Sequence, residues 1–158
     1  MKDFVINFLK NYPLVCAIVC WLLAQVVKVF TGMFKERKFN IITLLVSTGG
    51  MPSSHSAVVC GLATACIVQE GIASPYAAIA LVLALIVMVD ASGVRYESGK
   101  QAQILNKIMV ELFSPENSPE MFNTRLKELI GHTPLQVVCG SLLGAAIAFA
   151  YRFLLIFF

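Results

Sequence analysis

Long runs of apolar residues, separated by short polar segments, dominate the chain. Four of these runs are long enough for a membrane-spanning helix, and they cover residues 13–30, 52–69, 72–89 and 134–158. At a rise of 1.5 Å per residue, the first run reaches about 27 Å, close to the thickness of a bilayer core. We therefore predict an all-α integral membrane protein, a helical bundle with about four spans, in one domain that covers residues 1–158.

The segments between these runs are predicted to enter the bilayer only partly or to lie outside it. Residues 39–47 are apolar but too short to span, so we expect a re-entrant half-helix that turns back at Gly49 and Gly50. Residues 95–113 carry apolar side chains at helical spacing, which predicts an amphipathic helix that lies on the surface or caps the bundle. Residues 121–130 predict a short helix.

Composition supports the membrane assignment and excludes other classes. Apolar residues make up 58% of the chain and charged residues 13%, whereas soluble domains carry about a quarter charged residues. The net charge of +3 is too small, and too evenly spread, to indicate nucleic acid. The five cysteines lie inside apolar runs without metal-ligand spacing, so we interpret them as packing residues and expect no metal site.

Small residues recur at every fourth position on two of the predicted spans. This spacing lets two helices approach closely in lipid. It fits contact within one chain, and the second stripe also fits a homodimer seam. The stripes are Ala57, Gly61 and Ala65 on one span and Gly140, Gly144 and Ala148 on the other.

Polar residues gather at one end of the predicted bundle. If the four spans alternate in direction, both chain termini lie at one membrane face, here called face B. The polar residues at the span ends then share the opposite face, called face A. They are Lys28, His55, Asp90, Arg95 and His132.

Both histidines follow the same kind of sequence, at the start of a predicted helix. Glycine, proline and hydroxyl residues surround them in residues 49–56 and 131–134. Helix starts present unpaired N–H groups and a positive dipole end, which attract oxyanions and disfavour an imidazolium. A neutral imidazole can act as a nucleophile, and a protonated one as a general acid. Each histidine alone could be only a helix cap, and Lys28 alone could only extend to the interface.

Three segments together resemble a known family. They are Met-Pro-Ser-Ser-His-Ser at 51–56, Asp90-Ala-Ser-Gly-Val-Arg95 and Gly131-His-Thr-Pro-Leu-Gln136. The chain resembles, over roughly residues 13–151, the divergent branch of the phosphatidic acid phosphatase type 2 superfamily. That branch is also described as acid phosphatase/vanadium-dependent haloperoxidase-related membrane proteins. The resemblance implies an all-helical fold and hydrolysis of phosphate esters through a phosphohistidine, without metal or other cofactor.

The resemblance also implies roles for individual residues. Lys28, Ser53 and Ser54 would bind phosphate, His55 would protonate the leaving group, and His132 would be the nucleophile. The superfamily's usual motifs are K-x6-R-P, P-S-G-H and S-R-x5-H-x3-D.

This chain departs from those motifs at several positions. No arginine–proline pair follows Lys28 at the expected spacing, and Ser54 stands where the second motif has glycine. Arg125 precedes His132 by six intervening residues instead of five, and Gln136 stands where the third motif has aspartate. We keep Arg95, Arg125 and Gln136 as substrate-binding candidates. Asp90 is our own candidate for the missing catalytic carboxylate.

The expected function is that of a membrane phosphatase, a phosphoric ester hydrolase of the acid phosphatase kind. Its substrate would be a lipid or polyprenyl (isoprenoid) phosphate monoester or diphosphate, and its surroundings would be membrane lipid. The alternative is a non-catalytic membrane protein that binds an anionic headgroup or a partner helix. A transporter is disfavoured because the spans lack polar residues at mid-helix.

Basic residues predict the orientation in the membrane. Face A would hold nine lysines and arginines and face B three. Because basic loops stay on the cytoplasmic side, we expect the site face to be cytoplasmic, in the plasma membrane of a bacterium. Those of face A are Lys28, Lys35, Arg37, Lys38, Arg95, Lys100, Lys107, Arg125 and Lys127, and those of face B are Lys2, Lys10 and Arg152.

Overall fold

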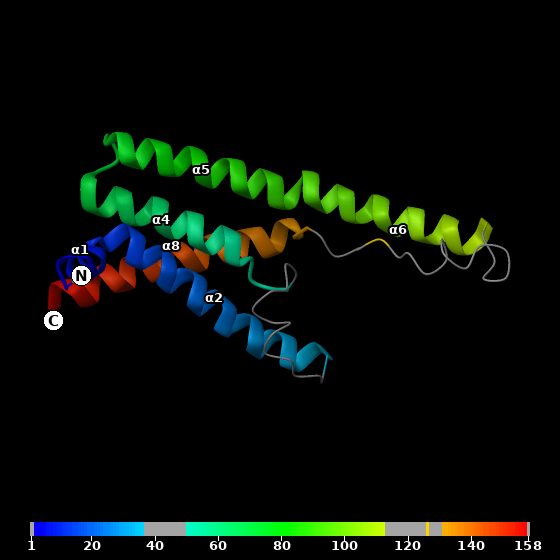
Figure 1. Ribbon diagram of the computed structural model, residues 1–158, viewed down its shortest axis with the longest axis horizontal. Helices are drawn as coiled ribbons and strands as arrows, with labels where there is room; N and C mark the ends of the chain where they lie inside the picture. The colour runs from blue at the N-terminus through cyan, green and yellow to red at the C-terminus, as the bar shows by residue number, and fades with distance from the viewer. Residues whose placement is uncertain (1, 37–49, 113–125, 127–130, 158) are drawn as a thin grey trace.

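The computed structural model describes residues 2–36, 50–112, 126 and 131–157 (Figure 1). This part of the chain is helical and contains no strand, which confirms the all-α prediction. Residues 39–47, and 121–130 apart from Leu126, lie outside the described residues, so the half-helix and short helix predicted there stay predictions. The helices are α1 (Lys2–Lys10), α2 (Tyr12–Glu36), α4 (Ser54–Glu70), α5 (Pro75–Ser92), α6 (Val94–Leu112) and α8 (Pro134–Phe157).

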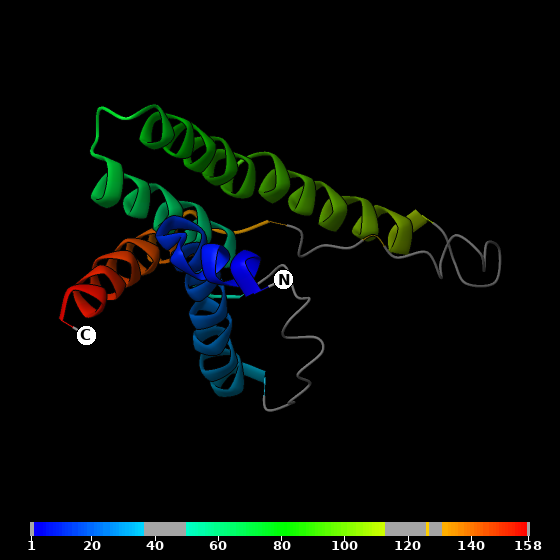
Figure 2. The same cartoon turned by 60° about the vertical axis from the view of Figure 1, so that its left-hand side comes forward.

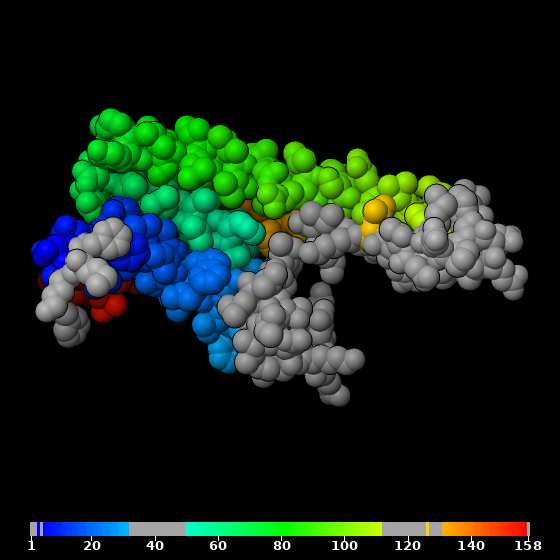
Figure 3. Space-filling model, in the orientation of Figure 1, coloured from blue at the N-terminus to red at the C-terminus, as the bar shows by residue number. Residues whose placement is uncertain are grey.

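Helix α4 is the centre of the bundle. It contacts α2, α5 and α8, and it fills the space between α2 and α5 (Figures 1 and 3). Its buried residues are small, which allows three neighbours to approach one helix closely. Ser53 caps its start, and Gly71, with a φ of +83°, ends it in a conformation that favours glycine.

The two predicted stripes of small residues face each other across the contact of α4 and α8. A Cβ atom added at Gly140 would lie 2.3 Å from the carbonyl oxygen of Ser53, and one at Gly144 would lie 2.1 Å from that of Ala57. Both distances are far shorter than a van der Waals contact between carbon and oxygen. Any side chain at these two positions would therefore clash with the backbone of α4 or of its capping residue. The stripe of Gly140, Gly144 and Ala148 therefore packs within one chain.

The cysteines of α2 pack into the same contact. Cys16 and Cys20 are fully buried, and a Cβ atom added at Gly61 would lie 2.4 Å from the sulfur of Cys20. The Cys20 thiol faces the carbonyl oxygen of Gly144 at 3.6 Å. All five cysteines are free thiols, which agrees with their interpretation as packing residues.

Three helical stretches are long and apolar enough to cross a membrane: Tyr12–Thr31, Pro75–Glu111 and Pro134–Phe157. Helix α4 corresponds to the second predicted span, residues 52–69; its 17 residues reach about 26 Å. The outer surfaces of α5 and α8 expose large apolar side chains such as Ile79, Leu85 and Leu142. Such surfaces suit lipid better than water, which supports an integral membrane protein.

Helix α6 is the amphipathic helix predicted from residues 95–113, but it does not cap the bundle. It continues α5 in nearly the same direction and extends beyond the other helices (Figures 1 and 2). The junction keeps helical hydrogen bonds, because the N–H of Gly93 donates to Val89 at 2.8 Å and the N–H of Glu97 donates to Gly93 at 2.9 Å. These bonds limit the change of direction at Gly93.

Both chain termini lie at the same end of the bundle (Figure 1). Helix α1, which the apolar pattern does not predict, packs against α2 at this end. The Tyr12 hydroxyl donates to the carbonyl oxygen of Ala148 at 2.8 Å and so joins the start of α2 to the second half of α8. The starts of α4 and α8 and the end of α5 meet at the opposite end. This alternation agrees with the predicted faces A and B.

Candidate functional site

The two histidines lie side by side at face A. Their ring centroids are 6.0 Å apart, and the ring planes are inclined by 56°. His55 is the second residue of α4 and is exposed, whereas His132 precedes α8 and is 2% exposed. The structure thus brings the two candidate histidines together, as the alternating spans predict.

Hydrogen bonds join the start of α4 to the first turn of α8. The N–H of Ser53 donates to the carbonyl oxygen of Gln136 at 3.0 Å. The Ser53 side-chain oxygen accepts from the Ser56 N–H at 3.3 Å and from the Ser56 hydroxyl at 3.0 Å. Because Ser53 accepts in both side-chain contacts, its own O–H remains available to donate to a ligand.

Lys28 is a buried cation within this cluster. Its side chain is 4% exposed, and its Nζ donates to the Ser54 hydroxyl oxygen at 3.1 Å. The lysine's aliphatic stem passes Gly50, whose φ is +95°. Among the described residues Lys28 forms no ion pair, since the two salt bridges found there involve Arg95 and Lys100. A buried cation without a counter-ion is costly, so the site favours an anion.

The contacts of His132 leave one ring nitrogen unused. Its backbone N–H donates to the carbonyl oxygen of Ala91 at 3.0 Å, and its Nδ1 lies 3.3 Å from Gln136 Oε1. The same Oε1 accepts from the N–H of Thr133 at 2.9 Å. The Nε2 atom is buried and has no hydrogen-bond partner among the described residues. An unpartnered buried nitrogen is costly and is a mark of a functional site.

Burial lowers the pKa of His132 below the ordinary histidine value, because the protonated ring loses its hydration. The hydrogen bond with Gln136 acts in the opposite direction, and the charges of Lys28, His55 and Arg95 lower the pKa further. The imidazole is therefore neutral near pH 7, as a nucleophile requires.

The segment that carries His132 is held against the junction of α5 and α6. A Cβ atom added at Gly131 would lie 2.3 Å from the backbone nitrogen of Tyr96 and 2.6 Å from the carbonyl carbon of Arg95. Only glycine fits such a close approach. Together with the bond to Ala91, this contact fixes the position of His132 relative to α5 and α6.

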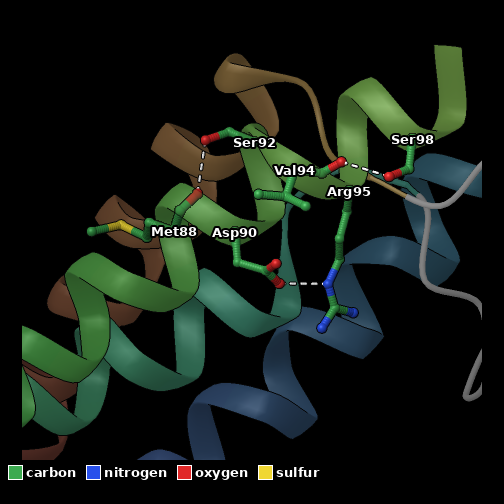
Figure 4. Close-up of polar contacts among 6 residues, drawn as sticks. All are labelled: Met88, Asp90, Ser92, Val94, Arg95 and Ser98. Atoms are coloured by element: carbon green, nitrogen blue, oxygen red, sulfur yellow. Dashed lines mark hydrogen bonds and ion pairs between the residues drawn. The ribbon is translucent and has the colours of Figure 1, made fainter. Parts of the chain in front are cut away.

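Asp90 and Arg95 form an ion pair across this junction. Their side chains point toward one another from α5 and α6 (Figure 4). Both are about half exposed, and such a pair contributes at most about 1 kcal/mol to stability. The effect of Arg95 on the pKa of His132 shows that its charge is within electrostatic reach of the site.

The structure thus brings most of the predicted site residues together. Gln136 meets His132 and Thr133 through its side chain, while Arg125 lies outside the described residues. No group of three potential metal ligands occurs in the described part of the chain. Lys28, Ser53, Ser54, His55 and His132 gather where α2, α4 and α8 meet, with Asp90 and Arg95 at the adjoining junction.

Sequence reasoning missed several supporting residues. Ala91 contributes a backbone carbonyl, and Thr133 contributes a backbone N–H to Gln136. A backbone contact leaves no signature in side-chain chemistry. The glycine directly before a candidate histidine was the one available signal.

Comparison with known proteins identifies the family. The family model described as Divergent PAP2 family matches residues 9–147 of this chain. The chain belongs to the Divergent PAP2 family. The match includes all the candidate site residues, and it confirms the resemblance seen in the three sequence segments.

A curated relative in this comparison is the uncharacterized membrane protein YuiD of Bacillus subtilis (strain 168). It is 37% identical over 158 residues, which cover 94% of this chain and 99% of the relative. No solved structure matches the chain. Together with the apolar helices, the relative supports an integral membrane protein related to PAP2.

Proposed function

We propose that this protein is a phosphoric ester hydrolase that acts on a lipid or polyprenyl phosphate, as a monoester or diphosphate. One observation carries the proposal: the buried Nε2 atom of His132 has no hydrogen-bond partner among the described residues, and the charges of Lys28, His55 and Arg95 act on its ring. An unpaired lone pair among donors suits an attack on phosphorus whose oxygens those donors hold.

The donors around His132 support oxyanion binding. Ser54 accepts from Lys28, so the serine's own O–H is available to donate, as is that of Ser53. The N–H groups in the first turn of α4 add the positive end of the helix dipole. Arg95, and Arg125 from outside the described residues, would add further charge. A phosphate would give Lys28 the counter-ion that it lacks among the described residues.

The reaction would proceed in two balanced steps. The Nε2 lone pair of His132 attacks phosphorus, the P–O bond to the alcohol breaks, and the imidazolium of His55 gives its proton to the leaving oxygen. Water then attacks phosphorus, the N–P bond breaks, and His55 takes a proton from that water. Nε2 has less than 1 Å² of exposed surface, so substrate binding has to displace the atoms that cover it.

A lipid phosphate is favoured by the surroundings of the site. Leu135 and Val94 stand next to site residues in the sequence, and they are 63% and 66% exposed. Exposed apolar side chains on helices that carry site residues suit a substrate whose alcohol part is a hydrocarbon chain. A soluble phosphate ester would gain nothing from this surface.

The test is phosphate release by the purified full-length protein from a panel of lipid and polyprenyl phosphates, with vanadate as a competitor. We expect His132→Asn to abolish release, and His55→Asn to lower the rate by about 10²- to 10⁴-fold. Quenching during turnover should trap a phosphohistidine in the wild type and none in His132→Asn. Gln101→Ala, at an exposed position on α6, is the control. Absence of release from the whole panel would refute the proposal.

A second candidate is a non-catalytic protein that binds an anionic headgroup. The presence of Gln136 where the superfamily has aspartate favours it, because an amide gives no charge to stabilise an imidazolium. Binding of phosphorylated lipid without phosphate release, weakened in Lys28→Gln, would support this second candidate.

We also propose that face A lies on the cytoplasmic side of a bacterial plasma membrane. The distribution of nine basic residues at face A against three at face B supports this orientation. The relative from Bacillus subtilis, whose name describes a membrane protein, supports a bacterial membrane.

A further inference from the structure

We infer that Gln136 is a positioning residue whose side-chain oxygen holds His132 in the tautomer that leaves Nε2 as the acceptor. The tautomer itself is independent of any activity. Its consequence for catalysis rests on the proposed function, in which Nε2 attacks phosphorus. Three neighbouring groups determine this tautomer: the backbone N–H of Thr133, the side-chain amide of Gln136 and the imidazole of His132.

The orientation of the Gln136 amide is set by the backbone. The N–H of Thr133 points at Oε1 from 2.9 Å, and a backbone N–H can only donate, so the atom that faces it is the amide oxygen. The same oxygen lies 3.3 Å from Nδ1 of His132. Since an amide oxygen cannot donate, Nδ1 carries the hydrogen of this contact. A neutral imidazole has one N–H, so Nε2 carries a lone pair.

The groups in this arrangement are fixed at their backbones. The carbonyl oxygen of Gln136 accepts from Ser53 at 3.0 Å, and the N–H of His132 donates to Ala91 at 3.0 Å. The N–H of Gln136 in turn faces the Thr133 hydroxyl oxygen at 3.4 Å. These backbone bonds fix the positions of His132 and Gln136 relative to each other, so turning the imidazole over would break the contact between Nδ1 and Gln136 Oε1. Nε2 is the ring nitrogen for which this arrangement provides no hydrogen-bond partner within the described part of the chain.

An amide in this position orients the ring without adding charge. The charged and titratable groups around His132 are Lys28 from α2, His55 from α4, Arg95 from α6 and its ion-pair partner Asp90 from α5. The carboxylate of Asp90 is paired with Arg95, so the net charge around the His132 ring is positive. His132 thus stays unprotonated at neutral pH, ready to attack.

The test reads the tautomer directly. Full-length protein with ¹⁵N-labelled histidine in detergent micelles should give, by NMR, a protonated Nδ1 and an unprotonated Nε2 for His132. We expect Gln136→Met, which removes the acceptor, to give a mixture of tautomers. Gln136→Glu, which keeps an oxygen, should retain the Nδ1–H tautomer. Gln101→Met on the exposed side of α6 is the matched control and should leave the signals unchanged.

A second readout separates positioning from a merely structural role. In Gln136→Glu the added carboxylate favours the imidazolium, so the acid limb of the pH–rate profile should move up by about one to two pH units. A uniform loss of rate without that movement, or an Nε2–H tautomer in the wild type, would overturn the inference. A wild type with the Nδ1–H tautomer but no phosphate release would refute the proposed function and leave the tautomer assignment standing.

Discussion

Replacing Lys28 should change stability and anion binding in opposite directions. Lys28→Met keeps a long unbranched side chain but removes the cation that is buried at 4% exposure. In the unliganded protein that cation has no carboxylate partner within the described residues, so it adds a desolvation cost. With an oxyanion bound, the same cation becomes a strong donor.

The magnitudes follow from these contacts. Replacing even paired buried charges by apolar residues of similar volume stabilises proteins by about 1–4 kcal/mol, so the unliganded variant should gain about 1 kcal/mol or more. A hydrogen bond to a charged group contributes about 1.5–3 kcal/mol, so affinity for vanadate or phosphate should fall about 10- to 100-fold. Ser54 loses the Lys28 contact but can still cap or donate.

Thermal unfolding in detergent, with and without vanadate, measures both effects in one titration. The wild type should show a lower melting temperature than Lys28→Met without ligand and a larger increase with vanadate. Lys10→Met removes an exposed lysine at face B and is the matched control, with neither effect expected. A variant that is less stable without ligand and binds vanadate like the wild type would refute the reasoning.

Further predictions concern packing, titration, metals and orientation. Gly140→Ala should cost about 1–3 kcal/mol of unfolding free energy and lower activity, because its Cβ would lie 2.3 Å from the backbone of Ser53; Ala150→Leu on the exposed face of the same helix should cost far less. Because burial lowers the pKa of His132, the acid limb of the pH–rate profile should lie below pH 6.5, while the alkaline limb reports the loss of the proton that His55 donates; an acid limb above pH 6.5 would contradict this. Chelators should leave phosphate release unchanged, whereas full inhibition that one divalent ion reverses would require a metal. A cysteine introduced within residues 114–119, in a background without reactive native thiols, should react with a membrane-impermeant reagent only after lysis; labelling of intact cells would reverse the orientation.

Much of the fold could be predicted because lipid imposes simple patterns. The long apolar runs became α2, α4, α5 and α8, and the small-residue spacing marked the contact between α4 and α8. The direction of α6 could not be predicted, because it depends on hydrogen bonds on either side of Gly93 rather than on side-chain pattern. Sequence gives the period of a helix but not the angle at its end.

The residues of the candidate site could be predicted from the sequence, but the hydrogen bonds between them could not. Alternating spans were enough to bring Lys28, His55 and His132 to one face. The partner of each polar atom was not visible in the sequence, and the double contact of Gln136 Oε1 with Nδ1 and a backbone N–H depends on local geometry. The sequence makes Asp90 a candidate for the catalytic carboxylate, and the structure pairs it with Arg95.

The central position of α4 has a consequence for how the protein enters the membrane. Its buried face consists of small residues, and it is shorter than its neighbours, so alone it would transfer little apolar surface into lipid. A connection of only four residues joins it to α5, a helix that exposes many large apolar side chains. The translocon is therefore expected to release α4 and α5 together, as a hairpin. In that case, polar substitutions on the lipid-facing side of α5 would impair the insertion of the helix that carries His55.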